Sequence, residues 1–220
     1  MSEIVTTSAS SCTSLAHLVA LGEPGLTVAL SLDGNRFVAS LALDQREHCR
    51  RQAAGNGPVS STSLLHALWE LPAGFAIAWD TLPDRVVERL RQSGSGWIDD
   101  TGSSVTRLYE PAGHLQLVGV GDIRLSRAIE RAARLPPVYT RVAIWDRPPR
   151  SYKRSAHHLA AAEALGIGVV ASGDEMTVLL QPGLPQRGVP SVYRWWLAEL
   201  AYRNWLMHRE PTAQAGALAW

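Results

Sequence analysis

Lysine is almost absent from the sequence, since only Lys153 among the 21 basic residues is a lysine. The cationic chemistry is therefore that of guanidinium groups, which are planar, permanently charged and suited to phosphates and carboxylates. Any role that needs a lysine falls on this one residue. The formal net charge of only +1 conceals how unevenly the arginines are distributed.

Cysteine is also scarce, and long apolar runs are missing. Cys12 and Cys49 have neither the spacing of metal ligands nor a disulfide framework around them, so a reducing cytoplasm is the expected compartment. No run approaches the roughly 18 to 20 apolar residues that span a bilayer. The opening MSEIVTTSASSC lacks the basic and apolar regions of a secretory signal. We therefore expect a cytoplasmic protein with no membrane partner.

Several catalytic motifs are absent as well. No Gly-x-Ser-x-Gly sequence supports a hydrolase triad. The glycines near residues 120 and 167 lack the spacing of a phosphate-binding loop. His157 and His158 are adjacent on a predicted helix, where their side chains face about 100° apart and cannot both bind one ion. These absences leave acidic and guanidinium groups as the candidates for chemistry.

The pattern of apolar residues predicts an α/β protein in three parts. With 220 residues, 46% of them hydrophobic, the chain can bury the core of one domain or two small ones. Apolar residues alternate on both sides of Asp33-Gly34-Asn35, which is a hairpin signal, and a short polar helix at 45–54 follows. We expect a hairpin-and-helix unit over 1–58, an α/β core over 59–188, and a C-terminal helix with its tail over 189–220.

Strands and helices alternate through the predicted core. Residues 75–79 are apolar on both faces, as a strand covered on two sides would be, and a helix at 84–94 comes next. Hairpin strands follow, and then a helix that runs from Ser126 to about Leu135, where prolines stop it. The remaining order is strand, helix, strand, strand. This order predicts a mixed central sheet flanked by helices on both faces.

Basic side chains gather at two places in this core. Four arginines in GVGDIRLSRAIERAARL, residues 119–135, recur every three or four positions and so lie on one side of a helix: Arg124, Arg127, Arg131 and Arg134. A second cluster contains Arg147, Arg150, Lys153 and Arg154. Such groups suit the phosphates of a nucleic-acid backbone. The nucleic-acid contacts are assigned to Arg127, Arg131, Arg134, Arg150, Lys153 and Arg154. The alternative is that the arginines only solvate an exposed helix face, with Glu130 neutralising part of the charge.

Acidic residues are predicted on neighbouring strands of the same core, at Asp99, Asp100, Glu110 and Asp122, with Glu88 on the preceding helix. Magnesium-dependent cleavage of phosphodiesters needs hard oxygen ligands and a cation near the developing charge. If the strand that contains Asp122 continues through Arg124, the two side chains share a face, because strand side chains alternate. A carboxylate and a cation would then point the same way.

The segments GVGDIRLSRAIERAARLPPVYTRVAIWD and AAAEALGIGVVAS resemble the PD-(D/E)XK nuclease superfamily, which has the restriction-endonuclease-like fold, over residues 60–182. In these nucleases a Glu-x-Lys strand leads into a helix, a short strand, a second helix and a further strand. The resemblance implies that Asp122 stands for the second acid and Arg124 for the lysine. It implies that Glu110, or Asp100, stands for the first acid and Glu88 for an optional helix acid. Glu110 and Asp122 would hold Mg²⁺, and Arg124 would stabilise the developing charge on DNA.

The motif departs from the family pattern at two points. No Pro-Asp pair precedes Asp122 at the family's spacing, and Tyr109-Glu110-Pro111 is the nearest substitute. Arg124 cannot give up its proton, although it can stabilise negative charge. The sequence therefore predicts a DNA-binding protein with a nuclease-like core, either a Mg²⁺-dependent phosphodiesterase or a relative that has lost this chemistry and holds no metal.

A second resemblance supports a different class of function. The stretch RLRQSGSGWIDDTGSSV is similar to a short segment of AbiEi-type antitoxins, in which a helix is followed by a strand with an aspartate and a glycine. Asp99 and Gly102 match that pattern, whereas Gly96 and Ser103 stand where asparagines are expected. The resemblance implies a non-catalytic DNA-binding regulator.

The last predicted helix, SVYRWWLAELAYRNWLMHRE, carries apolar residues on more than one face. Aromatic residues with arginine are enriched at protein interfaces, so this helix could join a homodimer or a protein partner through Trp195, Trp196, Tyr202 and Trp205. The alternative is that it packs within its own chain and fills a core. Membrane association is disfavoured because Glu199, Asn204 and Glu210 interrupt the apolar surface.

Overall fold

The protein is described by a computed structural model over residues 25–32, 35–94, 96–146, 148, 155–172, 176–185 and 192–209. The chain divides into two compact units, each made of segments that are distant in sequence. The α/β unit contains Met1–Ala42 and Leu115–Val189, and the helix-and-hairpin unit contains Leu43–His114 and Pro190–Trp220. The domain boundaries after residues 58 and 188 stay predictions. No helix in the described ranges is long and apolar enough to cross a membrane.

The α/β unit is built on a six-stranded mixed sheet, in the order β1-β2-β6-β7-β8-β9. The strands are β1 (Leu26–Leu32), β2 (Asn35–Leu43), β6 (Gly113–Asp122), β7 (Thr140–Asp146), β8 (Ile167–Ser172) and β9 (Met176–Leu180). Strands β6, β7 and β8 are parallel, whereas the pairs β1–β2 and β8–β9 are antiparallel. The predicted mixed central sheet and the predicted hairpin are confirmed. The hairpin forms one edge of the central sheet.

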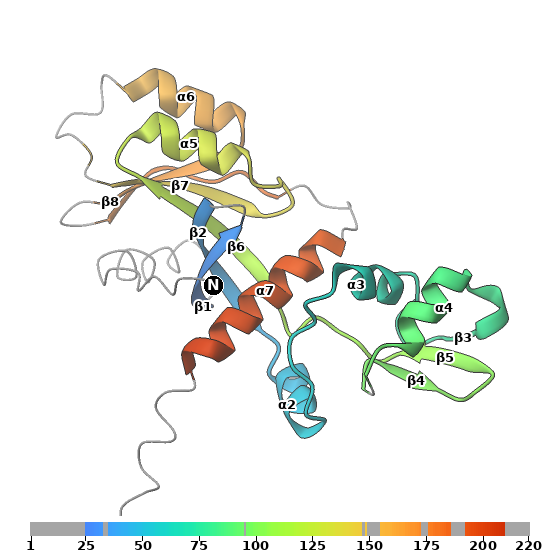
Figure 1. The fold of residues 1–220 in the computed structure, drawn as a ribbon. Helices are drawn as coiled ribbons and strands as arrows, with labels where there is room; N and C mark the ends of the chain where they lie inside the picture. The colour runs from blue at the N-terminus through green and yellow to red at the C-terminus, as the bar shows by residue number, and fades with distance from the viewer. Residues whose placement is uncertain are drawn as a thin grey trace, which may run out of the picture. The chain divides into compact units, whose positions relative to one another are not determined.

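Two helices connect the parallel strands of this sheet. Helix α5 (Leu125–Ala133) joins β6 to β7, and α6 (Ala156–Ala164) leads into β8. Parallel crossovers are almost always right-handed, so two successive crossovers in one direction put both helices on the same face of the sheet, as Figure 1 shows. Within the described residues, therefore, the helices of this unit cover one face and not the two that the sequence predicted. Four consecutive residues of β7, Val142 to Trp145, are buried.

The helix-and-hairpin unit has a second, smaller sheet, in the order β3-β5-β4. Its elements are α2 (Gln45–Ala53), α3 (Thr62–Trp69), β3 (Ala76–Ala78), the 3-10 helix η2 (Trp79–Thr81), α4 (Asp84–Arg91), β4 (Ile98–Asp100), β5 (Ser104–Arg107) and α7 (Val192–Arg209). Both strand pairs are antiparallel. The prediction that residues 75–79 form a strand covered on two sides is wrong, because Ala76 and Ala78 are exposed and β3 lies at the edge of the small sheet.

A compact apolar core holds this unit together. Helix α3 begins at Ser61, whose hydroxyl accepts a hydrogen bond from the Leu64 backbone at 3.2 Å, and it buries Leu65 and Leu68. Helix α4 begins after Pro83 and buries Val86 and Leu90, which lie on the apolar face that its periodicity predicts. The same core includes Trp79, Trp97, Val105 and Tyr109. One face of α4 is therefore fixed against the core, and the opposite face is exposed.

Candidate functional site

Asp122, the central residue of the predicted metal site, ends strand β6. Its Oδ1 accepts a hydrogen bond from the backbone N–H of Arg124 at 2.9 Å, and its Oδ2 lies 3.6 Å from the guanidinium of Arg131. Arg124 is the N-cap of α5 and not part of the strand. The strand therefore does not continue through Arg124, so Asp122 and Arg124 do not share a strand face. The Asp122 carboxylate instead stabilises the turn between β6 and α5.

The four predicted arginines of α5 differ in their contacts. Arg131 donates to the carbonyls of Gly121 at 3.0 Å and Arg36 at 3.1 Å, so it ties the helix to β6 and to β2. Arg134 pairs with Glu130 at 2.6 Å on the surface. Arg124 and Arg127 are exposed. Two guanidinium groups at the start of the helix thus face solvent. The predicted contacts at Arg150, Lys153 and Arg154 lie outside the described residues.

The predicted carboxylates do not share one sheet. Asp99 and Asp100 belong to β4, whose only neighbour in the small sheet is β5, whereas Asp122 belongs to the six-stranded sheet. The prediction that these acids lie on neighbouring strands is therefore wrong. Glu110 is exposed and belongs to the helix-and-hairpin unit. The metal and catalytic assignments of Glu110 and Asp122 stay predictions. Across the described ranges, no group of three or more His, Cys, Asp or Glu residues could hold a metal ion.

The aromatic residues of α7 pack inside their own unit. Tyr202 is 1% exposed, and its hydroxyl lies 2.8 Å from Nδ1 of His48. Trp195 packs against Trp69 and Tyr109, with ring centroids 4.6 and 5.0 Å apart. Tyr202 and Trp195 thus fit the alternative in which the helix fills a core. The interface assignment of Trp196 and Trp205, which are half-buried, stays a prediction.

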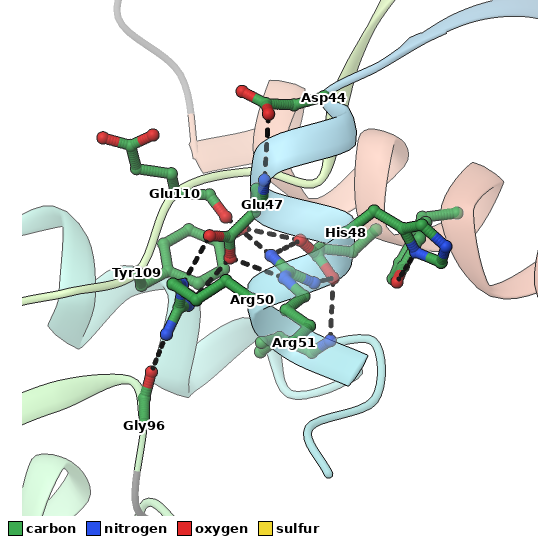
Figure 2. Close-up of polar contacts among 11 residues, drawn as sticks. Asp44, Glu47, His48, Arg50, Arg51, Gly96, Tyr109 and Glu110 are labelled. Carbon is green, nitrogen blue, oxygen red and sulfur yellow. Dashed lines mark hydrogen bonds and ion pairs between the residues drawn. The ribbon is translucent and has the colours of Figure 1, made fainter. Parts of the chain in front are cut away.

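A buried ion cluster, formed by Arg51, Glu47 and Glu199, joins α2 to α7 within this unit (Figure 2). Arg51 is fully buried and donates to Glu47 at 2.7 Å and to both oxygens of Glu199 at 2.8 Å. Glu199 also accepts from the Val59 backbone at 2.8 Å and from the Tyr109 hydroxyl at 2.9 Å. Each carboxylate oxygen of Glu199 therefore accepts two hydrogen bonds, so we interpret the cluster as a structural centre.

The surroundings of the cluster change its ionisation in a consistent way. Burial lowers the pKa of Arg51, but hydrogen bonds and charge from Glu199 outweigh that effect and leave it above the ordinary arginine value. Burial, together with the negative charge of Glu199, raises the pKa of the Tyr109 hydroxyl. Arg51 is therefore positively charged and the Tyr109 hydroxyl is protonated at neutral pH. Sequence patterns missed this cluster because QREHCRRQA is polar on every face and has the composition of a surface helix.

The exposed face of α4 carries polar side chains in a connected row. The amide Nε2 of Gln92 donates to Glu88 at 3.2 Å, and the guanidinium of Arg89 donates to Oε1 of Gln92 at 3.4 Å. Arg85 lies one turn before Arg89 and is also exposed. On the flank of the helix, Asp84, Val87, Glu88, Arg91 and Gln92 line a shallow hollow. The apolar periodicity predicts the buried face of this helix, but no pattern assigns a role to its exposed residues other than Glu88.

The hairpin β4–β5 is joined to the short helix η2 through Asp100. The indole N–H of Trp79 donates to Asp100 at 2.9 Å, and the backbone N–H of Gly102 donates to the same oxygen at 2.8 Å. The Trp79 hydrogen bond, followed by that of Gly102, lowers the pKa of Asp100. The guanidinium of Arg91 stacks over the Trp79 ring, 5.1 Å from its centroid. At the hairpin turn Gly102 has a φ of 86°, which favours glycine.

Comparison of the chain with family models, with curated proteins and with solved structures found no match.

Proposed function

We propose that the chain is a DNA-binding protein and that the helix-and-hairpin unit makes the principal contact. The order of elements supports this proposal: the short helix η2 is joined to α4 by Leu82 and Pro83, and the antiparallel hairpin β4–β5 follows α4 in the small sheet β3-β5-β4 (Figure 1). The major groove of DNA accepts one α-helix, and helix-turn-helix proteins insert the second helix of the motif there. Helix α4 corresponds to this second helix.

The single observation that carries the proposal is the composition of the exposed face of α4. Arg85, Glu88, Arg89 and Gln92 can donate to and accept from base edges and phosphates. A protein-docking face has instead an apolar or aromatic centre. Among the described residues, no large hydrophobic side chain that is exposed lies on α4. The face is therefore better suited to DNA than to the apolar surface of a protein.

Salt-dependent binding tests this function. The full chain is expected to bind a fluorescein-labelled duplex, with an affinity that falls between 50 and 200 mM KCl, because each neutralised phosphate releases counterions. Helix α4 carries two acidic residues beside its three arginines, so few phosphates are expected to be neutralised. A slope of roughly −2 to −4 in log K against log salt is expected for two to four contacts. Fluorescence anisotropy measures this slope, and absence of binding at 50 mM KCl would refute the proposal.

Magnesium-dependent phosphodiester cleavage is a second candidate function, carried by the α/β unit. Asp122 lies at the carboxyl end of β6 beside the exposed Arg124. In open α/β sheets, ligands bind outside the carboxyl ends of the parallel strands. This placement, together with the resemblance to PD-(D/E)XK nucleases, favours phosphate chemistry at this end of the sheet.

Replacing Asp122 by alanine separates the second function from the first. If the site is catalytic, Asp122→Ala is expected to reduce Mg²⁺-dependent cleavage of duplex DNA to background, because a hard oxygen ligand is lost. DNA affinity is expected to stay the same or to rise, since a negative charge is removed. Glu130→Ala, which removes an exposed acid from the same unit, is the matched control. Cleavage that survives in Asp122→Ala, or is absent from the unsubstituted chain, would rule out this site.

A further inference from the structure

We propose that α4 reads base edges in the major groove, and that Arg85 and Arg89 recognise guanine there. This inference rests on the proposed DNA-binding function and adds the class of sequence that the helix recognises. It assigns the ligand as duplex DNA whose contacted base pairs contain guanine. It also distinguishes these two arginines from Arg91, which lies on the opposite flank of the same helix.

Helix geometry places the proposed reading residues together. Positions 85, 88, 89 and 92 are spaced by three and four residues, so they form one stripe along the helix. Val86 and Leu90 are buried and lie toward the core, away from this stripe. The core therefore fixes the rotation of α4 about its axis, and the stripe must face outward. A helix held in this way presents the same side chains to every DNA site.

Arg85 and Arg89 are available for DNA. None of the ion pairs among the described residues includes either of them, whereas Arg50, Arg51 and Arg134 are all paired with glutamates. Among the described residues, Arg89 donates one side-chain hydrogen bond, to the side-chain oxygen of Gln92 at a long 3.4 Å, and a base edge can replace this acceptor. An unpaired guanidinium matches the two acceptors of guanine, O6 and N7, with two parallel donors.

Neighbouring side chains complete a set of donors and acceptors suited to bases. Gln92 can both donate to and accept from adenine, and Glu88 can accept from the amino group of cytosine. The hydrogen bonds from Gln92 to Glu88 and from Arg89 to Gln92 orient these side chains along one line. Glutamate directed at phosphates would be repelled, so its position in the middle of the stripe favours base contacts over backbone contacts.

Arg91 is not assigned to base recognition because its guanidinium already contacts an aromatic ring. Its guanidinium stacks over Trp79, whose indole is hydrogen-bonded to Asp100 in the hairpin. Three elements, α4, η2 and β4, are thus connected through one aromatic ring. The hairpin is thereby held beside the flank of α4 that does not carry Arg85 and Arg89. The stripe formed by residues 85, 88, 89 and 92, here called the reading stripe, is left uncovered.

The test uses the full chain and its own preferred DNA. Duplexes are selected from a randomised library at 100 mM KCl, and each guanine of the preferred duplex is then replaced by 7-deazaguanine, which lacks the N7 acceptor. The unsubstituted chain is expected to lose about 5- to 150-fold in affinity at one or two guanines, the range for a bidentate contact. Arg85→Ala and Arg89→Ala are each expected to lose a similar factor on the unmodified duplex and to become insensitive to 7-deazaguanine at one position.

Two further variants test whether the effect depends on the guanidinium group and on its position in α4. Arg89→Lys keeps the positive charge and loses the planar fork, so its sensitivity to 7-deazaguanine is expected to fall below that of the unsubstituted chain while the salt slope stays within about one unit. Arg203→Ala removes an exposed arginine from α7 of the same unit and is expected to leave affinity and base preference unchanged.

The outcomes separate the inference from the function on which it rests. Selected duplexes without a common guanine, or α4 variants that keep full sensitivity to 7-deazaguanine, would overturn base reading while DNA binding stands. Complete absence of DNA binding would overturn both. If the α4 variants leave DNA affinity unchanged, the helix is not the reading element, and a protein partner becomes the occupant of this face.

Discussion

Replacing Glu199 by alanine is expected to lower the free energy of unfolding by roughly 3 to 5 kcal/mol, the usual cost of breaking a buried ion pair. The substitution leaves Arg51 fully buried and without its main counter-charge, and it removes the acceptor for the Val59 backbone and the Tyr109 hydroxyl. Urea unfolding followed by tryptophan fluorescence measures this effect, since Trp97 and Trp195 both pack against Tyr109 in the same unit.

A double substitution shows whether the stability lost in Glu199→Ala comes from the unpaired charge of Arg51 or from the loss of side-chain packing. Arg51→Met combined with Glu199→Leu removes both charges and keeps most of the volume, so it is expected to restore a large part of the stability lost in Glu199→Ala. Arg203→Ala, on the exposed side of α7, is expected to change stability by less than about 0.5 kcal/mol. A loss below about 1 kcal/mol in Glu199→Ala would show that the cluster is not the structural centre described above.

Replacing Leu90 by alanine is expected to cost roughly 2 to 5 kcal/mol, because the side chain is fully buried and its removal leaves a cavity between α4 and the core of its unit. The matched control is Arg89→Ala, one residue earlier on the exposed face, with an expected change within about 0.5 kcal/mol. Urea unfolding measures both changes. Equal effects of the two substitutions would contradict the orientation of α4 on which the reading stripe depends.

Local patterns predicted most of the elements but few of the long-range contacts. The alternating apolar residues before and after Asp33-Gly34-Asn35 correctly predicted that β1 and β2 pair as antiparallel strands, and the apolar spacing of Val86 and Leu90 correctly gave the buried face of α4. The position of the β1–β2 hairpin could not be predicted, because its neighbour β6 begins 70 residues after the end of β2 in the sequence. The order of strands along the chain also predicted β4 and β6 as neighbours in one sheet, since nothing local distinguishes strands that pair with different partners.

The roles of charged residues were the least predictable part of the candidate site. Spacing correctly put Arg127 and Arg131 on the same helix, but it gave no sign that Arg131 donates to two backbone carbonyls while Arg127 faces solvent. Likewise, nothing in the local sequence marks Arg51 as buried, because two of its three acceptor residues, Glu199 and Glu110, come from distant segments and only Glu47 is local. A charged side chain acquires its role from tertiary contacts that hydrophobic periodicity does not report.

The position of α7 has a consequence for how the protein is made. Residues 43–114 leave the ribosome early, but their Arg51 pairs with Glu199, which is synthesised only after the whole α/β unit. Until α7 is synthesised, Arg51 lacks the carboxylate of Glu199, and the apolar surface against which Trp195 packs is exposed to solvent. Folding of the earlier segment is therefore expected to finish after that of the segment synthesised later, reversing the usual vectorial order of domain folding.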